Sequence, residues 1–388
     1  MIIGFDATML VYQGSGVATY THSLLVSLLE NDKKNDYKVF YSSLRRPKAI
    51  NNKLNIYRQL GARVYDYSIP HRLVNIAWNH LHLVPIELLI GSIDVLVSSD
   101  FFRPPSIKKV KGLTTIHDLT WKIFPEYHQP QIIKAHERKI KRTIAYHDII
   151  VTDSKNTKED LLKYCPNIKN TNNIHTIPLG IDERFYKIGK KHTAAILRKY
   201  KLPYPAQYLL YVGAIEPRKN LDRVIKLYNQ LIQDSKFADF KLLVVGRAGW
   251  NKESIFQLVH NLKLEEQVVF TGYMPDEDLV GFYNAAKVTL YLSSYEGFGL
   301  PPLESARCGT PFLTYRHASM AEYFNTSVKN CYTNPGRELQ SLRRVIDKKT
   351  DLQDRLIAVA SRFSWDVYAH ELIAIYSSNH KEQTLSYT

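Results

Sequence analysis

The stretch VTLYLSSYEGFGLPPLESARCGTP, residues 288–311, contains the clearest strand–turn–helix pattern in this sequence. Its opening apolar run, VTLYLSS, is typical of a buried parallel strand. Gly297 and Gly299 follow, at positions where the backbone must turn sharply or approach a ligand. Pro301 and Pro302 suit the first turn of a helix, where a missing N–H group costs little. The pattern therefore predicts a strand, a glycine turn and a helix in succession.

Two glutamates, Glu296 and Glu304, lie on either side of that turn. We expect Glu296 at the strand end, outside any core, and Glu304 one to two turns into the helix. A glycine-lined helix N-terminus between them favours phosphate through free N–H groups and the helix dipole. Carboxylates beside a phosphate site can accept hydrogen bonds from sugar hydroxyls, so the segment outlines a nucleotide-sugar site. The alternative is an ordinary strand–turn–helix with two solvated glutamates, and spacing alone does not separate the two.

The same alternation of apolar runs and helix-period segments continues through the chain, which is typical of parallel sheets covered by helices. The pattern breaks near residues 181–204, so we expect two domains. The expected strands are Ile2–Phe5, Val39–Tyr41, Val95–Ser98, Leu113–Ile116 and Ile149–Thr152 in the first half, and Tyr208–Gly213, Lys241–Val245, Gln267–Thr271, Val288–Tyr291 and Pro311–Thr314 in the second.

Length and composition fit a two-domain α/β protein of the cytoplasm. The chain has 388 residues, more than one ordinary domain, and 45% of them are hydrophobic. Asp6 interrupts the first apolar stretch, which we interpret as a strand instead of a signal peptide. Cys165, Cys308 and Cys331 form an odd, widely spaced set. That set argues against a disulfide framework or zinc site and fits a reducing compartment.

The net charge of +15 suggests an anionic partner. The densest basic patch is KAHERKIKR, Lys134 to Arg142, which we place on one helix. No nucleic-acid fold signature surrounds it, so we expect no nucleic-acid partner. Two interpretations remain open: a solvated helix face, or attraction to an anionic membrane surface, which would make the protein peripheral at the inner face of the membrane.

The motif E-x7-E inside YEGFGLPPLESARCGTP strongly resembles the donor-site motif of the retaining family-4 glycosyltransferases, which have the GT-B fold. Further segments resemble that family in the expected order, and only the region from about Lys33 to Arg103 does not. The matching segments are TTIHDLTWKIFPE (Thr114–Glu126), VTDSKNTKEDL (Val151–Leu161), IPLGIDERF (Ile177–Phe185), YVGAIEPRKNLDRVI (Tyr211–Ile225), VVFTGYMPDEDL (Val268–Leu279) and FSWDVYAHEL (Phe363–Leu372).

The resemblance implies two Rossmann-like domains with parallel sheets facing across a cleft that holds the site. Residues 1–186 would form the acceptor-side domain, together with a C-terminal crossover helix within residues 365–388. Residues 187–364 would form the domain that binds the nucleotide-sugar donor.

The resemblance also assigns roles to the residues of the E-x7-E motif. Glu296 would be catalytic and hold a sugar hydroxyl, and Glu304 would bind the ribose hydroxyls. The turn between them would complete the donor site, with backbone N–H groups assisting Glu296; its donor-binding residues are Gly297, Phe298, Gly299 and Leu300.

Arg218 and Lys219 follow the expected strand Tyr208–Gly213, at a strand end where open α/β sheets bind ligands. An arginine can bind phosphate oxygens bidentately, and a lysine acts as a point charge. Lys219 matches the lysine of the family motif. The family often carries an arginine where this sequence has Ala214, so Arg218 is the candidate to replace it.

The first half contributes two further candidates through the resemblance. His117 ends the strand LTTIH and matches the family histidine that contacts the donor sugar near the reacting centre, although a lone histidine is more often structural. Gly16, in the GSG loop after the first strand, matches a loop near the acceptor and the phosphates, although a plain turn is the default. Asp118 has the simpler interpretation of a cap for the next turn.

No metal or other cofactor is expected. Asp276 to Asp278 spell D-x-D, the metal motif of another glycosyltransferase fold. In YMPDEDLVGFY these acids open a helix, where they act as a cap and complement the helix dipole.

Taken together, these features predict a retaining hexosyltransferase that uses a nucleotide diphosphate sugar. Mannosyl transfer from GDP-mannose to a glycan or lipid-linked acceptor, in bacterial lipopolysaccharide or other surface polysaccharide assembly, rests on the family association of EPRKN-type sequences. A nucleotide-sugar epimerase or sugar phosphorylase of the same fold is one alternative, and a basic non-catalytic binding protein is another.

Overall fold

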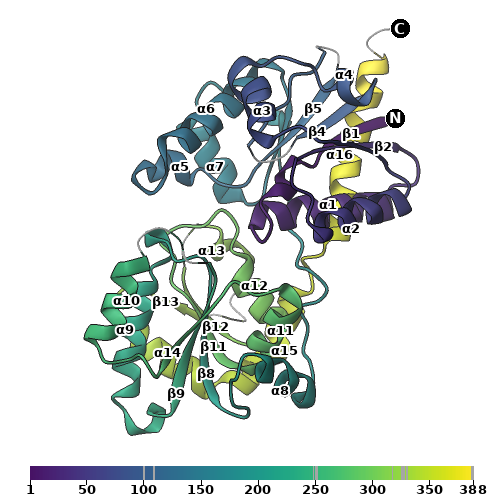
Figure 1. Cartoon of the computed structure of the whole chain (residues 1–388). Coiled ribbons are helices and arrows are strands. Elements are labelled where there is room, and N and C mark those ends of the chain that lie inside the picture. Colours follow the sequence, from purple (N-terminus) through teal and green to yellow (C-terminus); the bar gives the residue numbers. More distant parts are fainter. Residues whose placement is uncertain are drawn as a thin grey trace. The chain divides into compact units, whose positions relative to one another are not determined.

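The computed structural model describes residues 1–98, 101–107, 110–247, 249, 252–316, 318–324, 328 and 331–385, with the side chains of 349, 350 and 379–385 left out. The chain divides into two compact units (Figure 1). Unit 1 comprises residues 1–180 and 365–388, and unit 2 comprises residues 181–364. The sequence placed this division six residues later, after residue 186.

Unit 1 is built on a parallel sheet. Among its described residues, seven strands pair in the order β3-β2-β1-β4-β5-β6-β7. The first strand, β1, pairs in parallel with β2 on one side and β4 on the other. The strands are β1 (Ile2–Asp6), β2 (Asp36–Ser42), β3 (Arg63–Tyr67), β4 (Val95–Ser98), β5 (Lys111–Ile116), β6 (Ile149–Thr152) and β7 (Ile174–Thr176).

Helices connect the strands of this sheet and cover it, as parallel pairing requires. They are α1 (Gly16–Asn31), α2 (Lys48–Gln59), α3 (His71–Asn75), α4 (Glu87–Ile90), α5 (Thr120–Ile123), α6 (Pro130–Ala145) and α7 (Lys155–Tyr164), with short helical turns at η1 (Thr8–Val11), η2 (Ile76–Leu81), η3 (Pro125–Tyr127) and η4 (Thr171–Asn173).

The last helix, α16 (Trp365–Leu385), returns to unit 1 and packs on α1. Asp366 accepts hydrogen bonds from Ser27 at 2.9 Å and Asn31 at 2.8 Å. Farther along, the hydroxyls of Tyr20 and Tyr368 lie 3.0 Å apart. Polar contacts thus fix the helix that the family resemblance assigned to the first domain; residues 386–388 lie outside the described residues.

Unit 2 repeats the architecture with a sheet in the order β10-β9-β8-β11-β12-β13, counted over its described residues. Its strands are β8 (Gln207–Val212), β9 (Phe240–Val245), β10 (Val268–Gly272), β11 (Ala286–Tyr291), β12 (Phe312–Tyr315) and β13 (Tyr332–Thr333). Its helices are α8 (Lys190–Lys199), α9 (Leu221–Ile232), α10 (Lys252–Asn261), α11 (Asp276–Ala285), α12 (Leu300–Arg307), α13 (Met320–Tyr323), α14 (Glu338–Asp347) and α15 (Lys349–Ala360), with turns η5 (Pro217–Lys219) and η6 (Ser235–Phe237).

Three strands of the structure, β3, β7 and β13, were missed by the sequence analysis, and each lies at the edge of its sheet. An edge strand is covered on fewer sides, so it need not carry a continuous apolar run. In β3 the sequence RVYDY contains the charged residues Arg63 and Asp66, and no residue of it is fully buried. No helix in the described part of the chain is long and apolar enough to cross a membrane.

Candidate active site

The loop between β11 and α12 carries the predicted donor-site motif. Gly299 takes a left-handed backbone conformation, with φ of 93°, immediately before α12 begins at Leu300. This φ favours glycine, and a β-carbon there would also require the end of the Met320 side chain to shift, since Cε of Met320 would lie only 2.1 Å away. Ser319 Oγ donates to the carbonyl oxygens of Glu296 at 3.0 Å and Phe298 at 2.8 Å. The hydrogen bonds from Ser319 therefore fix the conformation of this loop.

Glu296 lies at the centre of a buried ion cluster. Its Oε2 is 2.8 Å from Nη1 of Arg218, and its Oε1 is 2.9 Å from Nζ of Lys219. The residue is 8% exposed, and all three charged side chains are largely shielded from solvent. The expectation that Glu296 lies outside any core is therefore wrong, because the loop folds its carboxylate inward onto the two cations.

Burial alone would raise the pKa of Glu296, but its charge partners reverse the direction. The charges of Arg218 and Lys219, and the hydrogen bonds that both donate, hold the pKa well below the usual glutamate value. Glu296 is therefore an anion throughout the working pH range. A carboxylate with so low a pKa is a poor proton acceptor, and it serves better as a fixed charge that positions its neighbours.

The two cations come from the turn η5, between β8 and α9. Asn220, in a left-handed conformation with φ of 51°, ends this turn and donates to Leu292 O and Ser294 Oγ, each at 2.8 Å. Ser294 N in turn donates to Arg218 O at 2.9 Å. The loops that follow β8 and β11 are thus joined to each other, and this junction brings Arg218 and Lys219 to Glu296.

Position 214 is an alanine and so has no guanidinium group, whereas Arg218 has one. Besides Glu296, its Nη1 contacts the carbonyl oxygen of Tyr295 at 2.7 Å. The backbone near Ala214 is packed tightly, because a β-carbon on Gly246 would lie 1.9 Å from Gly213 O. That Arg218 replaces an arginine at position 214 remains a prediction.

Glu304 lies in α12 and faces a different environment from Glu296. Its Oε2 accepts a hydrogen bond of 2.6 Å from the buried hydroxyl of Tyr283. Burial raises the pKa of Glu304 to about 8; the charges of Asp276 and Asp182 add to this shift, whereas the Tyr283 bond opposes it. Glu304 is thus largely uncharged at neutral pH, although it shares one motif with an anionic glutamate.

The predicted residues of unit 1 lie at the carboxyl ends of its strands. His117 follows β5, and its Nδ1 is 2.6 Å from Oδ2 of the buried Asp153, while the ring of Tyr20 meets it edge-on at 4.4 Å. The imidazole is therefore held in one orientation. Asp118 accepts from Thr120 N at 2.9 Å, which is the expected cap.

Gly16 is the first residue of α1, whose N-cap Ser15 accepts a hydrogen bond from Ala18 N at 3.3 Å. No atom lies within 4 Å of where a β-carbon on Gly16 would be. Packing within unit 1 therefore does not require glycine here, which leaves close approach of a ligand as a reason for it.

Comparison with known proteins finds glycosyltransferases among the relatives of this chain. Residues 193–360, nearly all of unit 2, match the family model described as glycosyl transferases group 1. The O-antigen chain mannosyltransferase B of Escherichia coli is 28% identical over 283 residues, which cover 71% of this chain and 72% of that protein. Unit 2 therefore resembles the group 1 glycosyltransferases over most of its length.

A second relative is much longer. The serotype-specific mannosyltransferase WbdA of Escherichia coli is 29% identical over 231 residues. These residues cover 58% of this chain and 28% of WbdA, so the chain spans little more than a quarter of that relative.

Structural comparison confirms the predicted GT-B fold. The crystal structure of Anabaena HepE in complex with UDP and glucose aligns with a TM-score of 0.67 over 98% of this chain and 100% of that chain. The sequence identity is 15%, so the likeness supports the fold alone.

The acids of the D-x-D sequence are already engaged by cations. Arg184 Nη2 lies 3.3 Å from Asp276, and its Nη1 lies 3.6 Å from Glu277. Asp278 contacts Lys199 at 2.6 Å and the Tyr200 hydroxyl at 2.8 Å. The described residues contain no group of three or more His, Cys, Asp or Glu side chains that could hold a metal ion.

Sequence reasoning missed the residues that support the ion cluster, namely Asn220, Ser294, Ser319 and Tyr291. The hydroxyl of Tyr291 is 3.3 Å from Nζ of Lys219 and its ring centroid 5.2 Å away. Asn220 had a usable signal, since asparagine before a helix tolerates the left-handed region. Ser319 had none, because it reaches Glu296 and Phe298 only through the tertiary fold.

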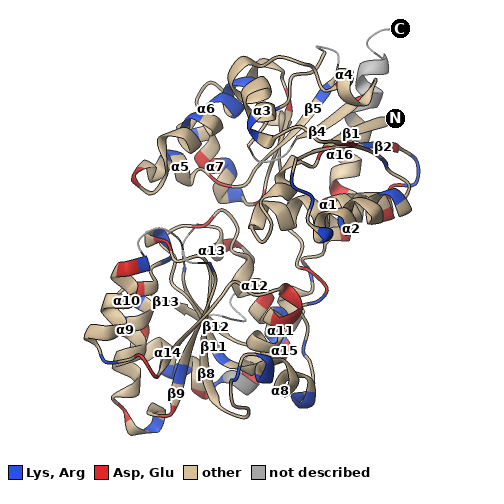
Figure 2. Cartoon of the chain, viewed as in Figure 1, with Lys and Arg blue, Asp and Glu red and all other residues tan. Residues whose placement is uncertain are grey.

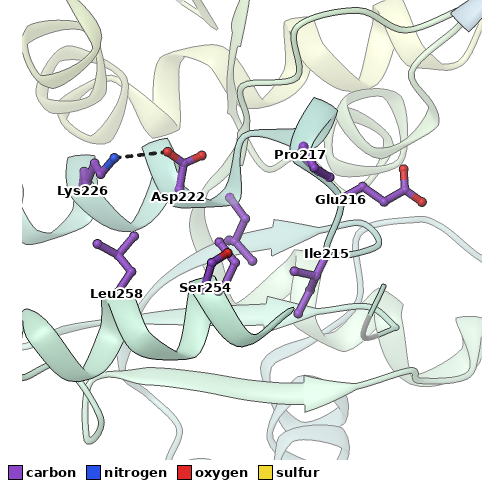
Figure 3. A pocket seen from close by; sticks show the side chains of 9 residues that line it. Ile215, Glu216, Pro217, Asp222, Lys226, Ser254 and Leu258 are labelled. Atoms are coloured by element: carbon purple, nitrogen blue, oxygen red, sulfur yellow. Dashed lines mark hydrogen bonds and ion pairs between the residues drawn. The ribbon is translucent and has the colours of Figure 1, made fainter. Parts of the chain in front are cut away.

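A pocket of about 370 Å³ lies between α9 and α10 (Figure 3). It is lined by Ile215, Glu216 and Pro217 and by residues of both helices, including the paired Asp222 and Lys226 at 3.2 Å. Neither Glu296 nor Lys219 lines it. The pocket therefore lies beside the ion cluster, since its lining residue Glu216 is 3.6 Å from Nη2 of Arg218.

Proposed function

We propose that the protein is a retaining mannosyltransferase that moves mannose from GDP-mannose to a glycan or lipid-linked acceptor. The observation that carries the proposal is the cluster of Arg218, Lys219 and Glu296 beside the glycine-bounded start of α12. The names of the relatives, O-antigen chain mannosyltransferase B and WbdA, support mannose as the sugar and polysaccharide assembly as the setting. HepE, which was solved with UDP, supports a nucleotide diphosphate as the leaving group.

The cluster suits a departing diphosphate. Negative charge on the diphosphate grows as the glycosidic bond breaks, and cations held in place stabilise it without reorganisation. Pro301 and Pro302 have no N–H group, so the start of α12 offers fewer free donors than an ordinary helix. Arg218 and Lys219 therefore carry most of this stabilisation, while Glu296 fixes them and accepts from a sugar hydroxyl.

The weakness of Glu296 as a base supports our proposal that configuration is retained. An inverting enzyme needs a general base opposite the leaving group. Glu296 cannot fill that role, because its pKa is held low by two cations. In our proposal the leaving phosphate accepts the acceptor proton, and His117, oriented by Asp153, contacts the donor sugar.

The anomer of the first-formed product tests this mechanism. Proton NMR of the glycoside made from α-linked GDP-mannose should show an α product. A β product would overturn both retention and the assignment of Glu296.

We further propose that transfer needs no metal ion, since Asp276 and Asp278 are occupied by Arg184 and Lys199. Activity should survive EDTA. A rate that collapses with EDTA and returns with Mn²⁺ or Mg²⁺ would contradict this part of the proposal.

The donor is tested by hydrolysis of a panel of GDP- and UDP-sugars with the purified chain, with and without acceptor. GDP-mannose should be turned over fastest, and acceptor should increase the rate. If any UDP-sugar is turned over faster, that sugar would replace GDP-mannose as the proposed donor. The proposal that the protein transfers a glycosyl group would still stand. The reaction is proposed for the cytoplasmic face of the membrane, where nucleotide sugars and lipid-linked acceptors meet.

A further inference from the structure

Unit 1 contains a pocket of about 390 Å³ at the carboxyl ends of β1, β2 and β3. Its walls come from the segments that follow these strands, within residues 11–13, 41–47 and 70–72. Two of these three segments belong to the region in which the sequence does not resemble the glycosyltransferase family. A strand-end pocket built by a chain-specific region is well placed to determine which acceptor the enzyme accepts.

Two arginines without carboxylate partners line this pocket. Arg45 and Arg72 are both exposed, and no ion pair involves either of them among the described residues. The neighbouring Arg46 differs, because its Nη1 lies 2.6 Å from Asp66. The described pocket lining contains no carboxylate, so its net charge is positive.

The loops that present these arginines are ordered by local hydrogen bonds. Ser43 Oγ donates to Arg45 O at 2.9 Å and accepts from Arg45 N at 3.2 Å. His71, beside Arg72, contacts the Tyr12 hydroxyl through Nε2 at 3.1 Å. Its Nδ1 is buried and has no hydrogen-bond partner in the described structure. Burial lowers the pKa of His71, so the imidazole is neutral and Nδ1 can carry the one ring hydrogen.

Exposed apolar side chains border the cations. Leu44, between Ser43 and Arg45, is 63% exposed, and Leu73, next to Arg72, is 53% exposed. From Leu73 the exposed apolar residues continue through η2 and into α4, at Ile76, Leu81, Leu83, Val84 and Leu88. A cationic pocket with an apolar strip close by in the sequence, at residues 73–88, suits an amphiphile with a phosphate head group.

We propose that this pocket binds the phosphate group of a lipid-linked acceptor, with Arg45 and Arg72 on the phosphate oxygens and Leu44 and Leu73 beside the lipid chain. The inference deepens the proposed function, because it assigns the acceptor a chemical class and a place in unit 1. Glycan acceptors without phosphate would not use these arginines.

Calorimetry with two amphiphiles of equal chain length tests the inference on the full chain. Decyl phosphate carries the proposed head group, and decyl maltoside is its neutral counterpart. The double variant Arg45→Gln/Arg72→Gln should bind decyl phosphate about tenfold or more weakly than wild type and leave decyl maltoside unchanged. A matched control, Lys163→Gln/Lys169→Gln, removes the same charge from exposed positions near the opposite edge of the sheet. It should bind both amphiphiles like wild type.

Three outcomes would overturn the proposal: equal decyl phosphate binding by the arginine variant and wild type, equal losses for both amphiphiles, or an equal loss in the lysine control. Vesicles of phosphatidylglycerol separate an acceptor site from general membrane attraction. An arginine variant that loses vesicle binding but keeps decyl phosphate binding would assign these arginines to the membrane surface and also overturn the proposal.

The hydrolysis of GDP-mannose without acceptor keeps this test independent of the proposed function. The arginine variant should retain the wild-type hydrolysis rate, because the ion cluster of unit 2 is untouched. Failure of wild type to use GDP-mannose would refute the proposed donor, whereas the decyl phosphate result would still decide the nature of the pocket.

Discussion

The two units differ in whether the cationic side chains of their strand-end loops are buried and paired with a carboxylate. In unit 2, Arg218 and Lys219 are shielded from solvent and both contact Glu296 within 3 Å. In unit 1, Arg45 and Arg72 are exposed and have no carboxylate partner in the described structure. Arg218 and Lys219 are therefore held in position before a ligand binds. Arg45 and Arg72 would be ordered only by the ligand itself.

This difference has an energetic consequence. Cations held by an internal anion lose little freedom when a diphosphate binds, so they suit transition-state stabilisation. Exposed arginines must be ordered by the ligand itself, which costs side-chain entropy and suits binding of a substrate group. Variants in unit 2 should therefore change the rate, and variants at the unit 1 pocket should change acceptor affinity.

The largest expected effect follows from removing Glu296. In Glu296→Ala, Arg218 and Lys219 lose the anion that positions them, and transfer should fall at least tenfold, a loss of about 1.4 kcal/mol of transition-state stabilisation. The free energy of unfolding should also fall, by about 1–3 kcal/mol, because two shielded cations remain without their partner. Transfer kinetics and urea denaturation measure the two effects. Glu253→Gln, an exposed acid at the start of α10, serves as the control.

Two results would contradict this view of the cluster. Activity above about a tenth of wild type would remove Glu296 from the mechanism. Unchanged stability would mean that the ion pairs contribute nothing to the folded state of unit 2.

Removing Lys219 should produce a smaller and more selective effect. A cation on the phosphates does not touch the base, so Lys219→Ala should weaken GDP binding by about tenfold and leave guanosine binding nearly unchanged. Calorimetry with both ligands measures the difference. Equal losses for GDP and guanosine would place Lys219 elsewhere in the site.

The two regions also differ in how much could be predicted from sequence. The strand β11, the glycine turn and the helix α12 follow from local patterns, and the motif around Glu296 specified the donor side. What the local pattern did not indicate is the inward fold of Glu296. That placement depends on Asn220 and Ser319, which connect loops far apart in the chain.

In unit 1 the pocket could not be predicted. Arg45 and Arg72 are 27 positions apart in a region without a recognised motif, and they meet only because β2 and β3 are neighbours in the sheet. The strand β3 was itself missed, since its edge position removes the apolar run that marks a buried strand. Without β3, the sequence offers no reason to place residues 70–72 beside residues 41–47.

A third prediction separates the two glutamates of the donor motif by pH. Glu304, with a pKa of about 8, becomes an anion between pH 7 and 9, and only the anion accepts hydrogen bonds from both ribose hydroxyls. GDP affinity should therefore rise over this range, by at most about tenfold, in wild type but not in Glu304→Gln. The titration of GDP itself affects both proteins equally. Comparing wild type with Glu304→Gln by calorimetry at each pH therefore removes that contribution. A flat wild-type profile would exclude Glu304 from ribose binding.

The same shift predicts how stability depends on pH. The folded protein holds the Glu304 proton up to about pH 8, whereas the unfolded chain releases it near pH 4.5. Unfolding thus releases a proton between these values, and wild type should lose stability relative to Glu304→Gln as pH rises from 5 to 8. A stability difference that is constant over this window would show that Glu304 is not shifted in the folded protein.

The smallest expected effect concerns the basic helix α6 of unit 1, where Lys and Arg residues are seen in Figure 2. The structure shows that this patch is not one solvated face, which was one of the two interpretations left open by the sequence. Lys139 is buried and donates to Thr115 O at 2.6 Å, and Arg142 donates to Asn79 O at 2.9 Å. Lys134 and Lys141 remain exposed, so they are the residues of this patch that can meet an anionic membrane.

We therefore expect Lys134→Gln/Lys141→Gln to weaken co-sedimentation with phosphatidylglycerol vesicles several-fold at low salt. A lysine near such a surface contributes about 1 kcal/mol before screening, and the difference from wild type should shrink as salt shortens the Debye length. Lys190→Gln/Lys191→Gln, with the same loss of charge at exposed positions of α8 in unit 2, should co-sediment like wild type. If both double variants lose binding equally, the overall charge of the chain governs vesicle binding and α6 has no special part in it. If the α6 variant binds like wild type, the apolar strip beside the Arg45 pocket becomes the only membrane-facing candidate among those we have described.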